Sequence, residues 1–280
     1  MTDRSFEAGL RRWLGEACRL GHPLAPGWIR EHLERVSYSR RLHLPMVEEQ
    51  CRVVEARVLD LGCGTGGTGV AFALAGARAI GLDRSETLLR LAALRAIEDR
   101  APLPLIQGDA RQLPFRSASF DVCVCEQLIE HVQDYPRLLL EVHRILRPGG
   151  IAVLAAPHRL ALREGHTGLL FASWLPSHWA GRYAAWRGCR MPGEPWDVWL
   201  ESPWSIRRRI RQAGFLELRS PWCQPRRPAT ADASRLRLVL ARVGPLVRLV
   251  RWAFRWQTFL FGTLTFVLTK PSTCPVGEGA

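Results

Sequence analysis

The sequence predicts an α/β fold with a mostly parallel seven-stranded sheet and helices on both of its faces. Two observations carry this prediction. Short apolar runs typical of buried strands alternate with helical patterns from about residue 54 to 157, as in parallel β-α-β units. Two further strand patterns follow after residue 214. With 280 residues, 47% hydrophobic and 23% charged, the chain can bury a substantial core.

Each element can be placed from its own residues. Apolar runs, most of them bounded by turn residues, predict strands over 57–61, 79–83, 104–107, 121–125, 151–155, 215–219 and 263–269. Apolar spacing predicts helices around 70–74, 86–100 and 135–146, and the stretch 147–150 reads as a turn. Ser202 as N-cap and Pro203 in the first turn predict a further helix that ends before Gly214.

The alternation stops after residue 157 and indicates an inserted cap. Five of the eleven tryptophans fall within 158–201, a segment too long for a simple connection. These tryptophans either line an apolar pocket or form the small core of the cap itself. We therefore expect an N-terminal helical segment (1–50), a ligand-binding core (51–157), the cap (158–201) and a C-terminal part of the core (202–280). An amphipathic basic helix over about 234–256 is inserted in that last part.

Acidic residues and glycines mark a binding site at the strand ends. Gly62, Gly64 and Gly67 form a glycine-rich turn directly after the first strand, a pattern shared by many cofactor sites. Asp60 distinguishes between the cofactor classes that bind to such a turn. Its carboxylate would repel the pyrophosphate of a dinucleotide but attract a cationic sulfonium cofactor with a free amino group. Asp83 and Asp109 end the next two strands, so the three acids meet in one crevice at the carboxyl edge of the sheet.

These stretches resemble the class I S-adenosylmethionine-dependent methyltransferases, of the family that includes the ubiquinone and menaquinone biosynthesis methyltransferases. The similar stretches lie in order between about residues 54 and 157: VLDLGCGTG at 58–66, GLD at 81–83, GDA at 108–110, LPF at 113–115, FDV at 120–122, EHV at 130–132 and RILRPGG at 144–150. The resemblance implies a Rossmann-like fold and S-adenosyl-L-methionine as the cofactor.

The resemblance also implies roles for individual residues. The methionine part of the cofactor would be held by Asp60, Gly62, Cys63, Gly64, Thr65 and Gly66. Asp83 would accept the ribose hydroxyls, and Asp109 with Ala110 would hold the adenine. Glu126 and Gln127 would line the methyl-transfer site. Arg84 departs from the family, where many relatives carry a hydrophobic or small polar residue, but arginine can stack on adenine.

Methyl transfer needs a base only where the acceptor must lose a proton, as a hydroxyl does. The candidates are His166, in a polar glycine-bearing loop of the cap, His158, also in the cap, and His131, in a stretch that relatives share across different substrates. The alternative for His166 is a solvated loop residue, and for His131 a structural position. We expect a small-molecule or lipid-like acceptor methylated at oxygen.

The charge distribution leaves other partners open. Of the net charge of +13, residues 201–280 carry +10, from 14 basic and 4 acidic residues. The 234–256 helix is either a packed helix with a solvated basic face or a contact with an anionic membrane, as in a peripheral methyltransferase of a lipid-linked glycan. An RNA or protein methyltransferase is a further alternative, although we expect no nucleic-acid partner, and a catalytically silent scaffold is another.

The cysteines and the N-terminus bear on location and metal binding. None of the eight cysteines pairs at the spacing of a zinc or redox site, so we expect no metal and reduced thiols. We expect a cytoplasmic protein, because the N-terminus lacks an apolar export segment and no apolar window is long enough to span a bilayer.

Overall fold

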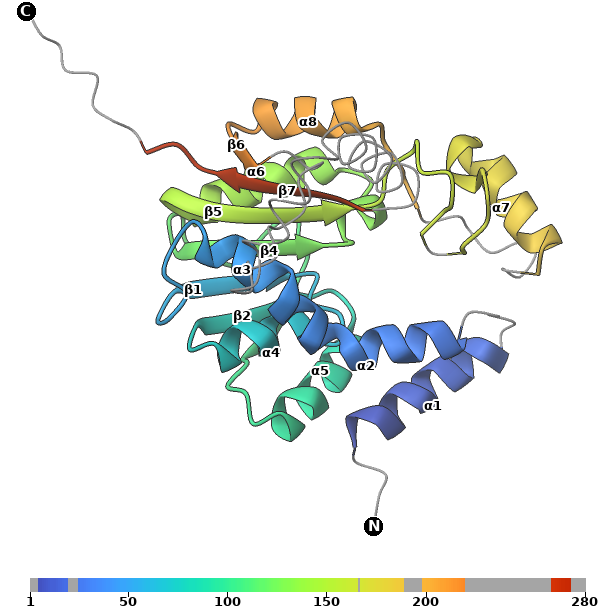
Figure 1. Ribbon diagram of the computed structural model, residues 1–280, viewed down its shortest axis with the longest axis horizontal. Helices are drawn as coiled ribbons and strands as arrows, with labels where there is room; N and C mark the ends of the chain where they lie inside the picture. Colours follow the sequence, from blue (N-terminus) through green and yellow to red (C-terminus); the bar gives the residue numbers. More distant parts are fainter. Residues whose placement is uncertain (1–4, 20–24, 166, 189–197, 220–262, 273–280) are drawn as a thin grey trace, which may run out of the picture.

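A single seven-stranded sheet organises the computed structural model, in the strand order β3-β2-β1-β4-β5-β7-β6 (Figure 1). The structure describes residues 5–19, 25–165, 167–188, 198–219 and 263–272. The pairs that join β3, β2, β1, β4 and β5 are parallel, and β7 runs antiparallel to both β5 and β6. This is the mostly parallel sheet that the sequence predicts.

The elements follow the predicted order. The strands are β1 (Arg57–Leu61), β2 (Arg78–Asp83), β3 (Leu105–Gln107), β4 (Phe120–Glu126), β5 (Leu146–Ala156), β6 (Leu216–Arg219) and β7 (Leu264–Thr269). The helices are α1 (Phe6–Arg19), α2 (Ala25–Arg41), α3 (His43–Glu48), α4 (Gly67–Leu74), α5 (Glu86–Glu98), α6 (Tyr135–Ile145), α7 (Ser177–Trp186) and α8 (Pro203–Gln212), with short 3-10 turns η1 (Ile129–His131) and η2 (Ala172–Trp174).

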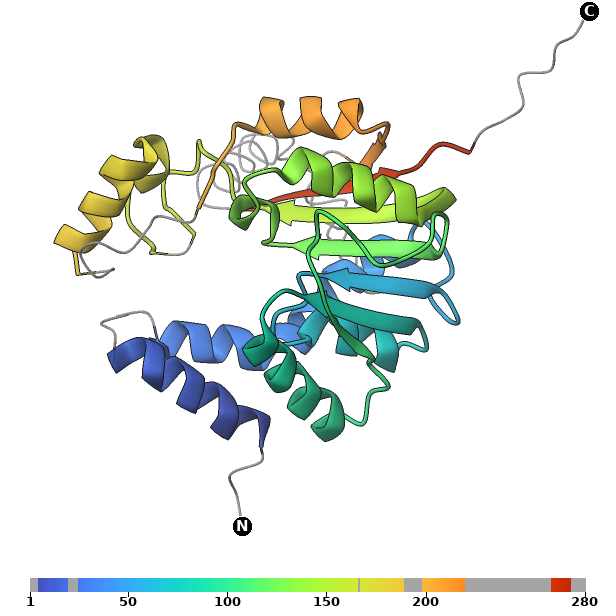
Figure 2. The same cartoon turned by 180° about the vertical axis from the view of Figure 1, so that it is seen from behind.

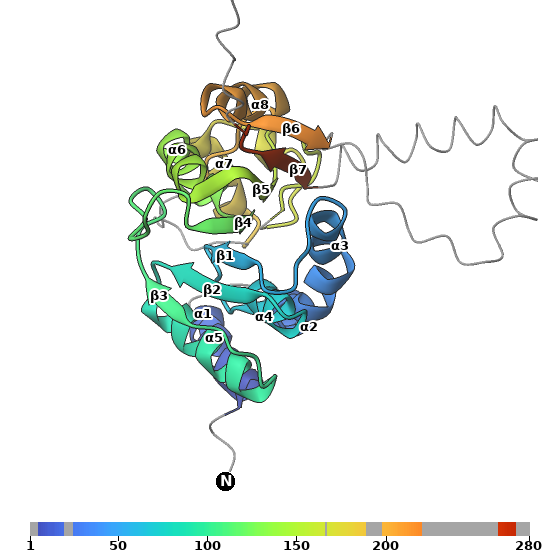
Figure 3. The same cartoon turned by 90° about the vertical axis from the view of Figure 1, so that its left-hand side faces the viewer.

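Alternate residues of the central strands pack into two separate hydrophobic cores, one on each face of the sheet. Leu59, Leu61 and Cys123 pack with α6 and α8, whereas Val58 and Val122 pack on the opposite face with α3 and α4. This period of two follows from the alternation of side chains along a strand. Seen along the sheet, helices cover both faces (Figure 3).

The junction of α6 and β5 differs from the prediction. The sequence predicts that the helix continues to Leu146, that 147–150 form a turn and that the strand begins at Ile151. In the structure α6 ends at Ile145, and β5 begins at Leu146 with a bulge, because Phe120 pairs with Leu146 and Val122 with Ile151. Lys270, the only lysine of the chain, donates to the carbonyl oxygens of His143 (2.9 Å) and Leu146 (2.8 Å). The cation thereby satisfies acceptors at the C-terminal end of α6.

Two additions extend beyond the sheet on the same side of the molecule. Figures 1 and 2 show α1 and α2 projecting past the ends of β1 and β2, and α7 projecting past β5. The amphipathic helix predicted over 234–256 lies outside the described residues. Among those described, no helix combines the length and the apolar character needed to cross a bilayer.

Candidate functional site

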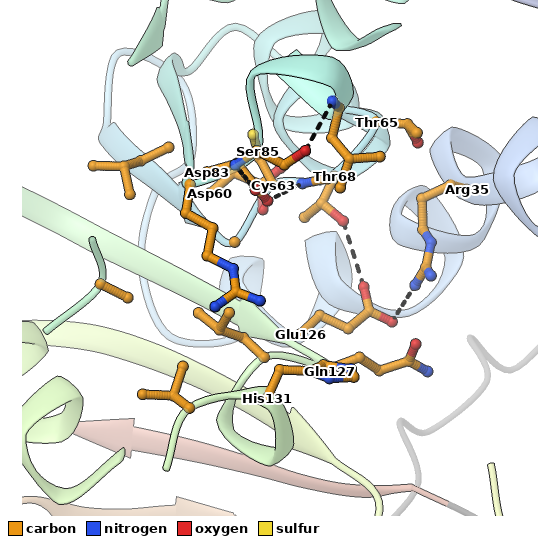
Figure 4. A pocket seen from close by; sticks show the side chains of 18 of the residues that line it. Arg35, Asp60, Cys63, Thr65, Thr68, Asp83, Ser85, Glu126, Gln127 and His131 are labelled. Carbon is orange, nitrogen blue, oxygen red and sulfur yellow. Dashed lines mark hydrogen bonds and ion pairs between the residues drawn. The ribbon is translucent and has the colours of Figure 1, made fainter. Parts of the chain in front are cut away.

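A cavity of about 690 Å³ lies at the carboxyl ends of the parallel strands (Figure 4). It receives residues from the turn after β1, the end of β2, the segment after β3 and the end of β4. Its lining includes most residues expected to hold the cofactor: Asp60, Gly62, Cys63, Gly64, Thr65, Asp83, Arg84, Asp109, Ala110, Glu126 and Gln127. The sheet topology thus brings together residues separated by nearly 70 positions in the sequence.

Asp60 lines this cavity and is only 3% exposed. Its Oδ2 accepts a hydrogen bond from the backbone N–H of Gly69 (2.7 Å), in the first turn of α4. Burial raises the pKa of Asp60 to about 7, because a charged carboxylate loses its hydration there. Ionisation of Asp60 near neutral pH would therefore be favoured by a cation placed beside it.

Asp83 shapes the turn after β1 from the neighbouring strand. Its Oδ2 accepts from the backbone N–H of Gly64 (2.9 Å), and its Oδ1 accepts from that of Ser85 (2.8 Å). A Cβ atom added at Gly64 would meet no atom within 4 Å, so the backbone of this turn borders open space. Each oxygen of Asp83 keeps a second lone pair, which can accept from a ligand hydroxyl.

Asp109 is held differently, at the exposed rim. The Arg111 guanidinium binds both of its oxygens, with Nη2 2.6 Å from Oδ2 and Nε 3.0 Å from Oδ1. The hydrogen bonds from Arg111 lower the pKa of Asp109 to about 2. This carboxylate is therefore ionised at all physiological pH values.

Glu126, at the end of β4, is anchored by the N-terminal helices. Arg35 of α2 places Nη1 2.7 Å from Oε1 of Glu126, and the two side chains are drawn together in Figure 4. Oε2 lies 3.5 Å from the hydroxyl of Thr68 and 3.5 Å from Nδ1 of His43. Burial lowers the pKa of His43, so its contact with Glu126 is made by a neutral imidazole at physiological pH. The carboxylate is thereby fixed at the cavity wall.

Residues that follow β4 also line the cavity. Gln127 has a positive φ of 50°, and its backbone N–H donates to the carbonyl of Ala155 (2.7 Å). A non-glycine residue in this conformation is unusual and is often found at binding sites. His131 follows in η1 and lines the same cavity.

Gly66 is placed differently from the other predicted cofactor residues that the structure describes. Gly66 is the left-handed N-cap of α4, with φ 76°, and does not line the cavity. A Cβ atom there would lie 2.9 Å from Cβ of Ala92 in α5, so this glycine permits close packing of α4 on α5. His166 lies outside the described residues.

The N-terminal helices contribute side chains to the cavity that the sequence does not predict. The cavity is also lined by Trp13 of α1 and by Glu31, His32 and Arg35 of α2. These side chains lie on helices whose local pattern shows only an apolar face and a charged face. The docking of these helices decides which of their charged residues reach the site formed by residues 60–131. The local sequence pattern does not indicate how the helices dock.

The cap tryptophans fit neither role expected for them as a group. Among the described ones, Trp199 lines the cavity, while Trp174, Trp179 and Trp186 are 49%, 52% and 78% exposed. The small core of the cap is formed by Leu169, Ala172, Tyr183 and Ala184. Trp196 lies outside the described residues.

Comparison with known proteins gives concordant findings. Residues 59–154 match the family model described as a methyltransferase domain. A probable S-adenosylmethionine-dependent methyltransferase of Mycolicibacterium smegmatis is 35% identical over 138 residues, which are 49% of this chain and 48% of that protein. A ubiquinone biosynthesis O-methyltransferase of Pseudomonas aeruginosa is 32% identical over 156 residues, 55% of this chain and 61% of that protein. The matched part thus spans only about half to three fifths of each relative.

The fold is similar to that of solved structures over a longer stretch. A chain of the complex between the Haloferax volcanii Trm112 methyltransferase activator and the putative methyltransferase has a TM-score of 0.55 and 22% sequence identity. The match covers 95% of this chain and 97% of that one. At this identity the likeness concerns the fold alone.

Proposed function

Residues 59–154 form a class I S-adenosylmethionine-dependent methyltransferase domain, and from this premise we propose that the protein transfers a methyl group to oxygen of a small or lipid-like acceptor. The observation that carries the proposal is the convergence of Asp60, Asp83 and Asp109 on one cavity. Methylation at oxygen is supported by similarity to ubiquinone biosynthesis O-methyltransferases, a name that describes those relatives.

The donor set fits S-adenosylmethionine. Buried Asp60 suits the cationic amino acid end, the free lone pairs of Asp83 suit the ribose hydroxyls, and Asp109 at the rim suits the adenine amino group. The open space at Gly64 lets a ligand approach the backbone closely. When bound, S-adenosylmethionine supplies a methyl group activated by a positively charged sulfur.

The chain itself mainly positions the acceptor and excludes water. Glu126, fixed by Arg35, and Gln127 would border the space in which the acceptor oxygen must lie. His131 borders the same cavity and would accept the proton of an acceptor hydroxyl. His166, another candidate base, remains a sequence-based expectation. The alternatives that use the basic C-terminal part rest largely on residues outside the described ranges.

Calorimetric titration with S-adenosylhomocysteine tests the cofactor site directly. We expect the wild-type protein to bind it and the Gly64→Asn variant to bind it at least tenfold more weakly. Asparagine tolerates a left-handed conformation better than other side chains, and here its amide would enter the open space of the cavity. A folded wild-type protein that binds no S-adenosylhomocysteine would contradict the proposal. Release of S-adenosylhomocysteine with a panel of hydroxyl, amine and thiol acceptors then tests the transfer to oxygen.

The affinity for S-adenosylhomocysteine should depend on pH through Asp60. The pKa of Asp60 is about 7 in the free protein, and the ligand ammonium group favours the ionised carboxylate. Below pH 7 binding must therefore release a proton, and the affinity should rise about tenfold per pH unit until it levels off above pH 7.5 or so. Calorimetry between pH 5.5 and 8 measures this dependence, roughly the range in which Asp60 ionises. The Asp60→Asn variant should show a flatter profile, and a wild-type affinity independent of pH would refute the role of Asp60.

A further inference from the structure

The cap presents a set of exposed aromatic, aliphatic and basic side chains. We call it the cap surface and define it by its most exposed members: Leu170, Phe171, Trp174, Leu175, Trp179, Arg182, Trp186 and Arg187. Trp179, Arg182 and Trp186 are spaced i, i+3 and i+7 on α7, so they share one side of the helix. Ala180 and Ala184, on another side of α7, are the residues that this helix buries. Trp179 and Trp186 therefore point away from the core of the cap.

Arginines accompany these rings. The guanidinium carbon of Arg182 lies 5.3 Å from the ring centre of Trp179, and that of Arg187 lies 5.9 Å from the ring centre of Trp186. Four arginines (Arg159, Arg163, Arg182 and Arg187) are exposed among the described residues between 158 and 188. Glu164 is the one acidic residue in the same stretch. It is 1% exposed, and its Oε2 accepts hydrogen bonds from the backbone N–H and the hydroxyl of Thr167. The exposed charge of this stretch is thus entirely positive.

The segment that carries the cap surface also contributes to the cavity, although the cap-surface residues themselves do not line it. Pro157, directly before the cap, and Gly165 and Trp199, within it, line the cavity. Helix α7 projects on the same side of the molecule as α1 and α2 (Figures 1 and 2). A partner bound to the cap surface would lie on the side of the molecule on which α1, α2 and α7 project.

We infer that the cap surface docks the protein on an anionic membrane. Tryptophan favours the interface between headgroups and acyl chains, where its apolar ring and polar N–H are both accommodated. The exposed leucines and phenylalanine add apolar area that can enter this interface, and the arginines match negatively charged headgroups. A nucleic acid would use the arginines but gains nothing from exposed leucines. Only the role of this docking, which is delivery of a lipid-like acceptor from the bilayer, rests on the proposed function.

Vesicle co-sedimentation of the full chain tests the inference without any methyl transfer. We expect binding to phosphatidylcholine vesicles that contain phosphatidylglycerol, much weaker binding to pure phosphatidylcholine vesicles, and weaker binding as salt is raised. The double variant Arg182→Ala/Arg187→Ala should lower the partition into anionic vesicles about thirtyfold, at about 1 kcal/mol for each arginine. Trp179→Ala/Trp186→Ala should lower it roughly tenfold or more for anionic and neutral vesicles alike.

A matched control uses the same residue types on another helix. Trp204 and Arg208 are exposed on α8, one turn apart, and Trp204→Ala/Arg208→Ala should bind anionic vesicles as the wild type does. Calorimetry with S-adenosylhomocysteine on every variant separates loss of docking from loss of the cofactor site. The inference is overturned if the wild type does not sediment, if the α7 variants sediment unchanged, or if the α8 control loses as much binding. It is also overturned if single-stranded RNA, but not anionic vesicles, binds in a way that depends on α7.

Discussion

Replacement of Asp83 by alanine should weaken S-adenosylhomocysteine binding by about a hundredfold or more. A carboxylate that accepts two ribose hydroxyls makes charge-assisted hydrogen bonds worth about 1.5–3 kcal/mol each. The same change removes the acceptor of the Gly64 and Ser85 backbone N–H groups, so the turn after β1 loses its anchor to β2. Both effects lower affinity, and Asp83→Ala is therefore the most damaging single change expected for binding.

The measurement is calorimetric titration of Asp83→Ala, with Asp134→Ala as the matched control. Asp134 is exposed, precedes α6, makes no capping hydrogen bond and does not line the cavity. The control should bind as the wild type does. Asp83→Asn keeps an acceptor oxygen but loses the charge, so its affinity should lie between the two. If Asp83→Ala bound S-adenosylhomocysteine like the wild type, the assignment of Asp83 to the ribose would be wrong.

Gly66→Ala should be among the most destabilising single changes in the cofactor-binding core. The residue has φ 76°, and the added Cβ would lie 2.9 Å from Cβ and 3.3 Å from Cα of Ala92. The second contact is with the backbone of α5, so no rotamer change can relieve it. Left-handed strain and overpacking together should lower the free energy of unfolding by about 2–4 kcal/mol.

Urea denaturation followed by circular dichroism measures this loss. Gly15→Ala is the matched control, because Gly15 lies within α1 and an added Cβ would meet nothing within 4 Å. In a helix alanine is favoured over glycine by about 0.5–1 kcal/mol, so this variant should be at least as stable as the wild type. A Gly66→Ala protein as stable as the wild type would show that α4 and α5 can move apart at little cost.

The core could be predicted from the sequence because its signals are local. Apolar runs such as 57–61 and 121–125 report buried strands, and parallel strands place their carboxyl ends at one edge. Asp60 and Asp83 therefore meet in the structure as expected. Their contacts with Gly69 and Gly64 were not predictable, because they depend on the exact path of the turn after β1.

The parts that escaped prediction depend on long-range docking. Arg35 and His43 come from helices whose sequences give no sign of Glu126, some 80–90 positions away. The sequence predicts a turn where the structure has a bulge at the start of β5, because Pro148 and two glycines give the same local signal in either setting. The abundance of tryptophan in the cap likewise does not predict that Trp179 and Trp186 are exposed, since tryptophan is more often buried.

The position of β7 has a consequence for synthesis of the chain on the ribosome. Residues 264–269 are inserted between β5 and β6, and Ile151, which pairs with Val122 on one side, pairs with Thr269 on the other. While the ribosome translates the intervening hundred or so codons, the nascent sheet ends in an open β5 edge, and β6 has no neighbour. Open strand edges recruit other chains, and pairings this distant in sequence form slowly. Until β7 has been made, the edge of β5 is therefore open to pairing with other chains, and we expect a product terminated before residue 264 to aggregate more readily than the full chain.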